Sequence, residues 1–279
     1  MRLQGHFPFS LFFRLKRIME ETCLNATKTD DVIFHCQATK SNTLNLSYRN
    51  LVVLPKTVSN LKSVRHLLLN SCNLLMPPAE ISELTSLQEL HIENNKLTMF
   101  PQGIRNATSI NCLCFSGNPV SCIASELPYL PSLTRLFMND TAISYLPTEL
   151  CLLKNLEYFS ASGNNLHSVP SEFSCLTKLK WVRLSRNSLS ALPKQFHKLK
   201  QLTYLDLCEN MYYEIPLVLT SLRNLSTLLL RNNKLSHISD EYSKFLCQLG
   251  KLDIRVNDIV DLPVEVMSSE ALFMGNNVT

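Results

Sequence analysis

The sequence predicts an elongated α/β solenoid, with a parallel sheet on the concave face and irregular or short helical segments on the convex side. Two observations predict it: an asparagine that recurs every 23 residues, and apolar residues that keep a fixed phase relative to it. A period between about 20 and 50 residues is typical of a chain built from stacked copies of one small unit. The chain has 279 residues, 45% of them hydrophobic and 18% charged, so it can bury a core.

The recurring asparagine marks the place where each unit is expected to leave its strand. An Asn side chain carries both a donor and an acceptor, so it can satisfy buried backbone groups and link one unit to the next. Arg49, Cys72 and Thr141 fill this position in three other units. Eight asparagines occupy it, and one of them is Asn277 in the shortened last unit. We call the other seven the asparagine ladder: Asn95, Asn118, Asn164, Asn187, Asn210, Asn233 and Asn257.

Apolar residues stand eight, five and three positions before the ladder and two positions after it, as Leu179, Val182 and Leu184 do before Asn187. The alternation at minus five and minus three predicts one short strand in each unit, stacked in parallel on its neighbours. Proline follows six positions after the ladder position in eight units, where its fixed φ and missing N–H suit a short helical return. These prolines are Pro55, Pro78, Pro101, Pro147, Pro170, Pro193, Pro216 and Pro263.

The pattern L-x-x-L-x-L-x-x-N-x-L is the signature of the leucine-rich repeat, and it covers residues 43–279 as ten units and a partial eleventh. The length of 23 residues and the style of "NNKLTMFPQGIRNATSI" resemble the class found in Ras-suppressor proteins, in the Scribble and Erbin family, and in the scaffold that joins a Ras-like GTPase to protein phosphatase 1. This resemblance implies a cytosolic, non-enzymatic scaffold or adaptor in intracellular signalling, with a small GTPase or a phosphatase as partner. The alternative is a structural subunit of a cytoskeletal or ciliary assembly, in which the edges of the solenoid make the contacts.

Both ends of the chain depart from the repeat. Residues 29–42 predict a helix that caps the first unit, with Thr29 or Asp30 as its N-cap. Residues 1–28 form an N-terminal extension, whose first 19 residues are basic without an acid and are compatible with a disordered start or with organelle targeting. The eleventh unit ends at Thr279 without a closing helix, so either the chain is truncated or another chain covers Leu272 and Met274. Unless another chain covers this edge, we expect a monomer.

Several function classes lack their sequence signals. The chain contains no G-x-G-x-x-G, P-loop, H-E-x-x-H or G-x-S-x-G motif, so we expect no enzyme and no cofactor. The net charge of +4 is spread over the repeats, which argues against a nucleic-acid partner, and no apolar run approaches the roughly 20 residues of a transmembrane helix. Ten cysteines are scattered through repeat positions, which favours a reducing, cytoplasmic location; a Cys23–Cys36 disulfide is the alternative for one pair.

Side chains six and four positions before the ladder point to the concave face, because side chains alternate along a strand. Tyr158, Trp181 and Tyr204 form an aromatic row there, and arginines flank it. Aromatic residues and arginine dominate the energy of protein interfaces, so we expect Trp181 to be open to a partner with an acidic or mixed surface. The predicted partner-binding residues are Arg135, Phe137, Tyr158, Trp181, Arg183, Arg186, Tyr204, Asp206 and Glu209.

A second group on the predicted concave face has the chemistry of a metal site. His66, Glu89, His91, Cys112 and Cys114 lie on consecutive predicted strands and offer imidazole, carboxylate and thiolate ligands. A C-x-C pair on a flat strand, however, lacks the turn that usually gathers zinc ligands. We therefore expect no metal, and these five residues are the candidates to inspect.

Overall fold

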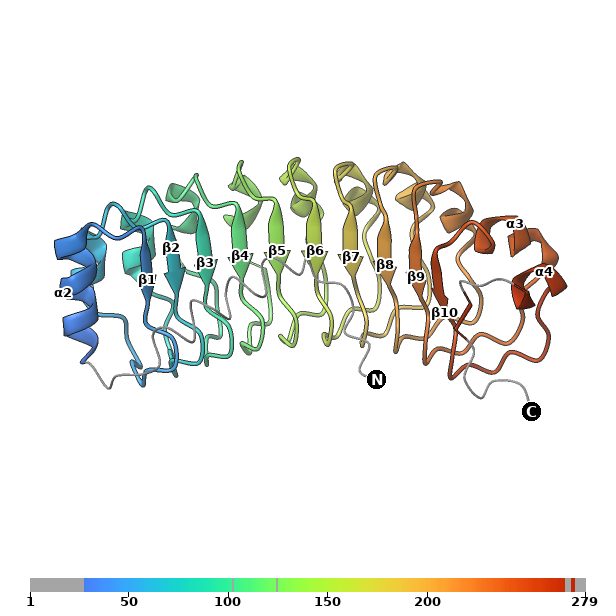
Figure 1. Cartoon of the computed structure of the whole chain (residues 1–279), viewed down its shortest axis with the longest axis horizontal. Helices are drawn as coiled ribbons and strands as arrows, with labels where there is room; N and C mark the ends of the chain where they lie inside the picture. The colour runs from blue at the N-terminus through green and yellow to red at the C-terminus, as the bar shows by residue number, and fades with distance from the viewer. Residues whose placement is uncertain (1–27, 102, 124, 269–271, 274–279) are drawn as a thin grey trace.

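The computed structural model describes residues 28–101, 103–123, 125–268 and 272–273, and it confirms the predicted solenoid. Its strands form one eleven-stranded parallel sheet in which each strand pairs with the next strand of the chain (Figure 1). The strands are β1 (Thr43–Asn45), β2 (His66–Leu68), β3 (Glu89–His91), β4 (Cys112–Cys114), β5 (Arg135–Phe137), β6 (Tyr158–Ser160), β7 (Trp181–Arg183), β8 (Tyr204–Asp206), β9 (Thr227–Leu229), β10 (Lys251–Asp253) and β11 (Leu272–Phe273).

The middle residue of each strand from β1 to β10 points into the core, and the two outer residues face away from it. In β7, Val182 is fully buried, while Trp181 and Arg183 lie on the opposite face of the sheet, which is the concave face. The register advances by one whole unit, so that Trp181 pairs with Tyr204 and Arg183 with Asp206. Each column of the concave face therefore collects one position of the repeat.

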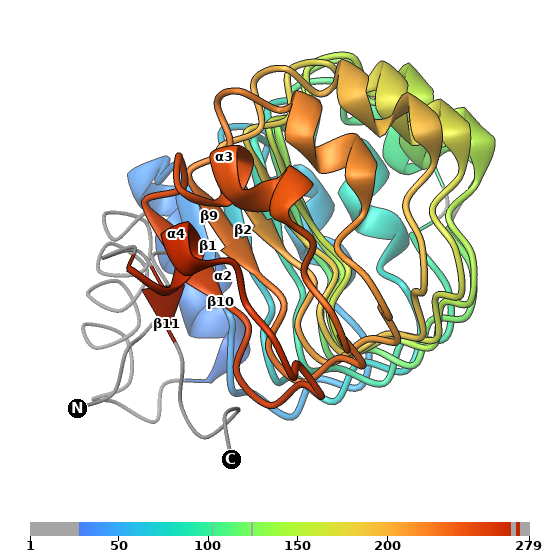
Figure 2. The ribbon, with the colours of Figure 1, turned by 90° about the vertical axis from the view of Figure 1, so that its right-hand side faces the viewer.

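The convex side consists of short helical segments that follow the recurrent prolines. In most units the proline is the N-cap of a 3₁₀ helix, with φ between −59° and −66° in Pro216, Pro55 and Pro78. Viewed along the solenoid, the strands lie on one side and these helices on another (Figure 2). The 3₁₀ helices are η1 (Lys56–Asn60), η2 (Ala79–Glu83), η3 (Ile104–Asn106), η4 (Leu127–Tyr129), η5 (Thr148–Leu152), η6 (Ser171–Cys175), η7 (Lys194–Lys198), η8 (Leu217–Ser221) and η9 (Asp240–Tyr242), and two α-helices are α3 (Ser243–Leu246) and α4 (Val264–Met267).

The unit after Asn233 contains the one extra residue of the repeat. Ser239 stands where other units have proline, and it is the N-cap of η9, which runs directly into α3. This connection is longer than a single 3₁₀ helix. The longer helical return thus accommodates the insertion without disturbing the pairing of β9 with β10.

The asparagine ladder joins consecutive units through the backbone. In Asn187, Nδ2 donates to the carbonyl oxygens of Ala161, Leu184 and Ser185 at 2.9, 3.0 and 3.2 Å, and Oδ1 accepts from the N–H of Leu166 at 3.0 Å. All seven ladder residues donate in the same way to a carbonyl of the preceding unit. The side-chain amide therefore satisfies backbone groups that the turn leaves inside the stack.

The residue before the ladder position adopts a left-handed conformation in each of the ten units whose turn the structure describes. Glycine tolerates this conformation best, and Gly117 and Gly163 supply it in two units. At Gly163, with φ of 64°, a Cβ atom would also collide with Oδ1 of Asp140 in the preceding unit. The full column with positive φ is Tyr48, Ser71, Asn94, Gly117, Asp140, Gly163, Arg186, Glu209, Asn232 and Val256.

The first unit is covered by α2 (Thr29–Thr39), which lies beside β1 (Figure 1). Ile33 and Cys36 of this helix are buried in the same core as Leu44 of β1. The predicted N-caps are wrong, because Lys28 occupies the N-cap position without a side-chain hydrogen bond and Thr29 and Asp30 lie inside the first turn. Asp30 and Asp31 there still stabilise the positive end of the helix dipole.

Some expectations fall on residues that the structure does not describe. The predicted extension at residues 1–28 and the exposed Met274 belong to this group, apart from Lys28 itself. Leu272 lies in β11, which pairs with β10. Of the cysteines, the nine that the structure describes are free thiols, including Cys36.

Candidate functional site

The concave face of β1–β10 consists of two columns, formed by the first and the third residue of each strand. The first column holds Thr43, His66, Glu89, Cys112, Arg135, Tyr158, Trp181, Tyr204, Thr227 and Lys251. The third column holds Asn45, Leu68, His91, Cys114, Phe137, Ser160, Arg183, Asp206, Leu229 and Asp253. All of the predicted partner-binding residues except Arg186 and Glu209 lie in these columns, as do all five metal candidates.

An aromatic group lies on β5–β8. The rings of Trp181 and Tyr204 stack with centroids 5.1 Å apart and an interplanar angle of 14°, and Phe137 meets Trp181 edge to face at 6.3 Å and 71°. Tyr158 packs against the same cluster and remains half-buried, as does Tyr204. Such ring pairs contribute beyond the area that they bury. The aromatic row of the sequence thus forms one packed surface.

The expectation that Trp181 is open to a partner is wrong. Only 8% of its surface is exposed, and Phe137 is 6% exposed, because both belong to a second hydrophobic cluster on the concave face. The position of a residue in the repeat predicts which face of the sheet its side chain is on, but it does not predict which neighbouring side chains cover it. Trp181 is therefore the base of the aromatic surface, and the half-buried tyrosines are its accessible part.

Each arginine near the aromatic group has a carboxylate partner. Arg183 Nε donates to Asp206 Oδ2 at 2.9 Å, with Asp206 almost fully buried. Arg186 Nη2 donates to Asp140 Oδ1 at 2.7 Å. The two residues lie two units apart, and their ion pair crosses Gly163 of the unit between them. Sequence reasoning missed Asp140. Its position in the same left-handed column as Arg186, with glycine between, was the available signal.

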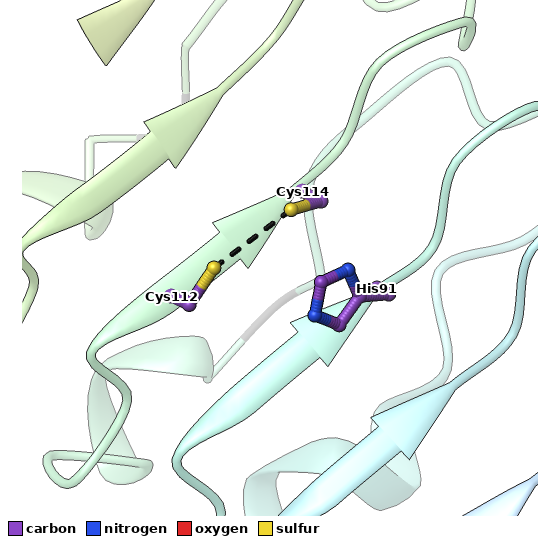
Figure 3. A group of neighbouring side chains, drawn as sticks. All are labelled: His91, Cys112 and Cys114. Carbon is purple, nitrogen blue, oxygen red and sulfur yellow. Dashed lines mark hydrogen bonds between the residues drawn. The ribbon is translucent and has the colours of Figure 1, made fainter. Parts of the chain in front are cut away.

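A second group lies on β3 and β4, and we call His91, Cys112 and Cys114 the thiol–imidazole cluster. The two sulfur atoms are 3.8 Å apart, and one ligand atom from each of the three residues lies within 4.8 Å of the others. Figure 3 shows the His91 ring on the neighbouring strand facing the two sulfurs. All three side chains are buried, with exposed fractions of 1%, 0% and 5%.

Glu89 connects this cluster to the charged residues around it. Its Oε1 accepts from Arg135 Nη2 at 2.9 Å, and its Oε2 lies 3.3 Å from His66 Nδ1 and 3.7 Å from His91 Nε2. Glu89 and Arg135 pair with Cys112 from its two sides in the sheet, so their ion pair extends across Cys112. Of the five metal candidates, the structure brings three together, places Glu89 beside them, and keeps His66 behind Glu89.

The electrostatics of the cluster follow from these contacts. The neighbouring His91 ring and the Arg135 guanidinium lower the pKa of Glu89 to about 2, although burial opposes the shift. Burial by itself would lower the pKa of His91, but Glu89 raises it above the ordinary value. The hydrogen bond between the sulfurs lowers the pKa of Cys112 and raises that of Cys114, whose burial raises it further. Of the two thiols, Cys112 therefore ionises more readily than Cys114.

Comparison with known families agrees with this architecture. Two models described as leucine-rich repeat match the chain, one over residues 162–211 and the other over residues 86–107. The chain is a leucine-rich-repeat protein. No enzyme family was found, and no curated protein sequence matches the whole chain or part of it significantly.

Solved structures extend the comparison of this leucine-rich-repeat protein to most of its length. A leucine-rich-repeat protein of Leptospira interrogans is 29% identical, with a TM-score of 0.75 over 82% of this chain and 64% of the other. The ectodomain of the receptor kinase GASSHO1/SCHENGEN3 from Arabidopsis thaliana, in complex with CASPARIAN STRIP INTEGRITY FACTOR 2, is 27% identical, with a TM-score of 0.66 over 81% of this chain and 31% of the other. A TLR13–ssRNA13 complex is 25% identical, with a TM-score of 0.67 over 83% and 35%.

The chain therefore spans less than two thirds of each of these three solved chains. Within the described residues, none of the helices has the length and apolar character that a membrane crossing requires. Leucine-rich repeats usually bind proteins and are usually not enzymes. The class with 23-residue units that the sequence resembles is not distinguished from other leucine-rich repeats by these relatives.

Proposed function

We propose that this leucine-rich-repeat protein is a non-enzymatic scaffold that binds a protein partner on the concave face of β5–β8. The observation that carries the proposal is the rigid aromatic surface. Trp181 is fixed between Phe137 and Tyr204, and Tyr158 packs against the same group. When a partner docks here, the side chains of the scaffold lose little conformational entropy, because these rings are already packed against one another.

The accessible part of this surface has the composition of an interface centre. Tyr158, Tyr204 and Arg183 are half-buried, and Arg186 is exposed at the end of β7. Tyrosine and arginine combine large contact area with directional polar atoms, which is why they dominate interface energies. The bound segment would lie across the strands, since the residues come from β5 to β8.

The charges favour a partner of mixed character over a strongly acidic one. Arg183 and Arg186 are each neutralised by a carboxylate of this chain, Asp206 and Asp140 respectively. The exposed Glu209 adds a negative charge in the same column as Arg186. Rim charges of both signs set orientation and association rate more than affinity.

The finer assignment follows from the resemblance of the 23-residue units. By that resemblance, we assign the protein to intracellular signalling, with a small GTPase or a phosphatase as partner. A cytoplasmic location is consistent with free cysteines scattered through the repeats, since a reducing compartment keeps thiols in this state.

The test is a comparison of two surface variants in affinity purification with mass spectrometry. Tyr158→Ala combined with Arg186→Glu alters the accessible concave surface and leaves Trp181 in place. Tyr129→Ala, on the exposed convex residue of η4, is the matched control. We expect the concave variant to lose the specific partner, with binding weakened more than about tenfold, a typical effect of changing central interface residues. Retention of the partner by the concave variant and loss by Tyr129→Ala would place the interface on the convex side.

A further inference from the structure

We propose that His91, Cys112 and Cys114 bind a zinc ion on the concave face of β3 and β4. This site adjoins the proposed protein-binding surface on β5–β8, because Cys112 and Cys114 belong to the same hydrophobic cluster as Phe137 and Trp181. Metal binding goes beyond the proposed function. A zinc site here differs from our sequence-based expectation that no metal binds, which rested on the C-x-C pair lacking a turn that gathers ligands. The reason for the departure is that the third ligand comes from the next strand.

The register of the sheet brings the ligands together. Cys112 and Cys114 are the first and third residues of β4, so both side chains point to the concave face. His91 pairs directly with Cys114, and Glu89 pairs directly with Cys112. Four metal-ligating side chains thus occupy the corners of one block of two strands, which are about 4.8 Å apart in a sheet.

The distances are close to those of a zinc complex. Two sulfurs bound tetrahedrally to one zinc, each at about 2.3 Å, are about 3.8 Å apart, and the Cys112 and Cys114 sulfurs are 3.8 Å apart. A sulfur and an imidazole nitrogen on the same zinc are about 3.6 Å apart, whereas here the three ligand atoms lie within 4.8 Å of one another. A shift of the His91 ring by about 1 Å toward the sulfurs therefore completes the three-ligand geometry.

His91 provides the independent observation that points to a ligand. It is 1% exposed, and its Nε2 has no hydrogen-bond partner in the described part of the chain. The nearest carboxylate oxygen, Glu89 Oε2, lies at 3.7 Å, which is too long for a hydrogen bond. Zinc binding would give both ring nitrogens a role: Nδ1 would coordinate the metal, and Nε2, which faces Glu89 Oε2, would donate to that carboxylate, as metal-bound histidines usually do.

Charge and surroundings also suit a buried zinc ion. Two thiolates and a neutral imidazole cancel the charge of Zn²⁺, so the complex can be buried at low cost. Leu68 and Phe137 flank the cluster in the third column and are almost fully buried. Thiolate and imidazole ligands favour zinc over calcium and magnesium, which prefer oxygen. Three protein ligands leave a fourth position for water.

A Cys112–Cys114 disulfide is the competing use of the two thiols. Residues two apart on an extended strand have Cα atoms roughly 6.6 Å apart, near the upper end of the range that a disulfide spans. The structure has both as free thiols. The strand geometry therefore favours a shared ligand over a covalent bond between the two sulfurs.

The first experiment uses cobalt as a spectroscopic probe for the zinc site in the full chain. We expect one equivalent of Co²⁺ to give a thiolate-to-cobalt absorption in the near ultraviolet and the intense visible bands of tetrahedral cobalt, with Zn²⁺ displacing it. Cys112→Ser combined with Cys114→Ser should abolish these bands, and Cys175→Ser, a half-exposed cysteine of η6, should retain them. Glu89→Gln should weaken metal affinity by about 10-fold to 100-fold, the usual effect of losing the partner of a ligating histidine. Absence of the bands, or their persistence in the double variant, overturns the proposal.

The second experiment uses the unmodified chain, so that it does not depend on the folding of a variant. Zinc should slow alkylation of Cys112 and Cys114 at least tenfold more than alkylation of Cys72, which is equally buried but lies outside the cluster. Mass spectrometry of the labelled peptides reports each site separately. Equal protection of the three cysteines, or none, contradicts the zinc site. Elemental analysis of protein purified without chelator should show zinc, and copper in its place would contradict the assignment of the metal.

Discussion

The asparagine ladder and the thiol–imidazole cluster are both buried, polar and built from adjacent units, yet their bonding differs. In the ladder, the amide of Asn187 bonds three carbonyls and one N–H of the backbone. In the cluster, the two thiols bond each other, and His91 Nε2 has no hydrogen-bond partner among the described residues, the nearest carboxylate oxygen lying 3.7 Å away on Glu89. Buried polar groups are normally satisfied because leaving them unpaired is costly. The ladder is explained by the fold, and the cluster is not.

This difference distinguishes two kinds of sequence regularity. The ladder repeats at one position of nearly every unit because every turn exposes the same backbone groups. The cluster occurs in one pair of units, and in the third column the flanking strands carry the apolar Leu68 and Phe137. Repetition in a solenoid therefore marks what the fold requires, and a local departure that buries polar atoms marks a candidate for function.

The largest effect is expected from breaking the ladder. Asn187→Ala removes four hydrogen bonds to buried backbone groups, so we expect the free energy of unfolding to fall by about 3 kcal/mol. The carbonyls of Leu184 and Ser185 keep bonds from Asn210 Nδ2 and from the N–H of Gly163. Asn165→Ala is the control, because Asn165 is exposed beside the ladder residue of the preceding unit. Chemical denaturation followed by circular dichroism measures both. Equal midpoints for the two variants would show that the amide bonds do not stabilise the stack.

A smaller loss is expected at the left-handed turn before the ladder. Gly163→Ala places a Cβ atom at a φ of 64° and against Asp140 Oδ1, so we expect a loss of about 2 kcal/mol. Combining it with Asp140→Ala relieves the collision and should recover part of the loss, while the backbone strain remains. The same denaturation measurement applies, and an unchanged midpoint for Gly163→Ala would contradict the turn geometry.

The smallest effect, of opposite sign, is expected in the core. Tyr212 stands where most units have leucine or another aliphatic residue, and its fully buried hydroxyl has no hydrogen-bond partner among the described residues. Tyr212→Phe should therefore raise the free energy of unfolding by about 1 kcal/mol. This variant measures what an unpartnered polar group costs where no ligand is proposed. A loss of stability would indicate that the hydroxyl has a partner.

The same residue gives a pH dependence with a defined sign. Burial raises the pKa of Tyr212, so the folded state favours the neutral phenol. Below the unfolded tyrosine pKa of about 10, the wild-type chain should keep its full free energy of unfolding. Above that pH, the free energy of unfolding should fall, because the unfolded state releases the phenol proton and the folded state retains it. The difference between Tyr212→Phe and wild type should widen above that pH. A constant difference would contradict the buried phenol.

Most of the fold could be predicted from sequence because its elements repeat. The apolar phase around Asn187 sets which strand residues are buried, and the proline six positions later begins the convex helix, as Pro193 does for η7. The cap of α2 could not be predicted with the same success. Thr29 and Asp30 are both favourable N-cap types, and only the backbone geometry decides that Lys28 takes the position.

For the candidate site, the sequence predicted which face of the sheet each side chain lies on, but not how deeply the side chain is buried. The period of two correctly places Trp181, Cys112 and His91 on the concave face. It says nothing of the stacking on Tyr204 that buries Trp181, or of the Arg135–Glu89 pair that extends across Cys112. These contacts depend on rotamers and on residues one or two units away. Asp140, the carboxylate partner of Arg186, was missed for the same reason.

The most direct test of the contrast between ladder and cluster is the stability of a chain whose cluster is made apolar. In His91→Leu, Cys112→Val, Cys114→Val, the new side chains continue the apolar contacts of Leu68 and Phe137. In the presence of a chelator, we predict that this triple variant unfolds at the same denaturant concentration as wild type or a higher one, and that added zinc raises the midpoint of wild type alone. If the triple variant with chelator loses as much stability as Asn187→Ala, or if zinc shifts both chains equally, then the cluster belongs to the fold and the contrast fails.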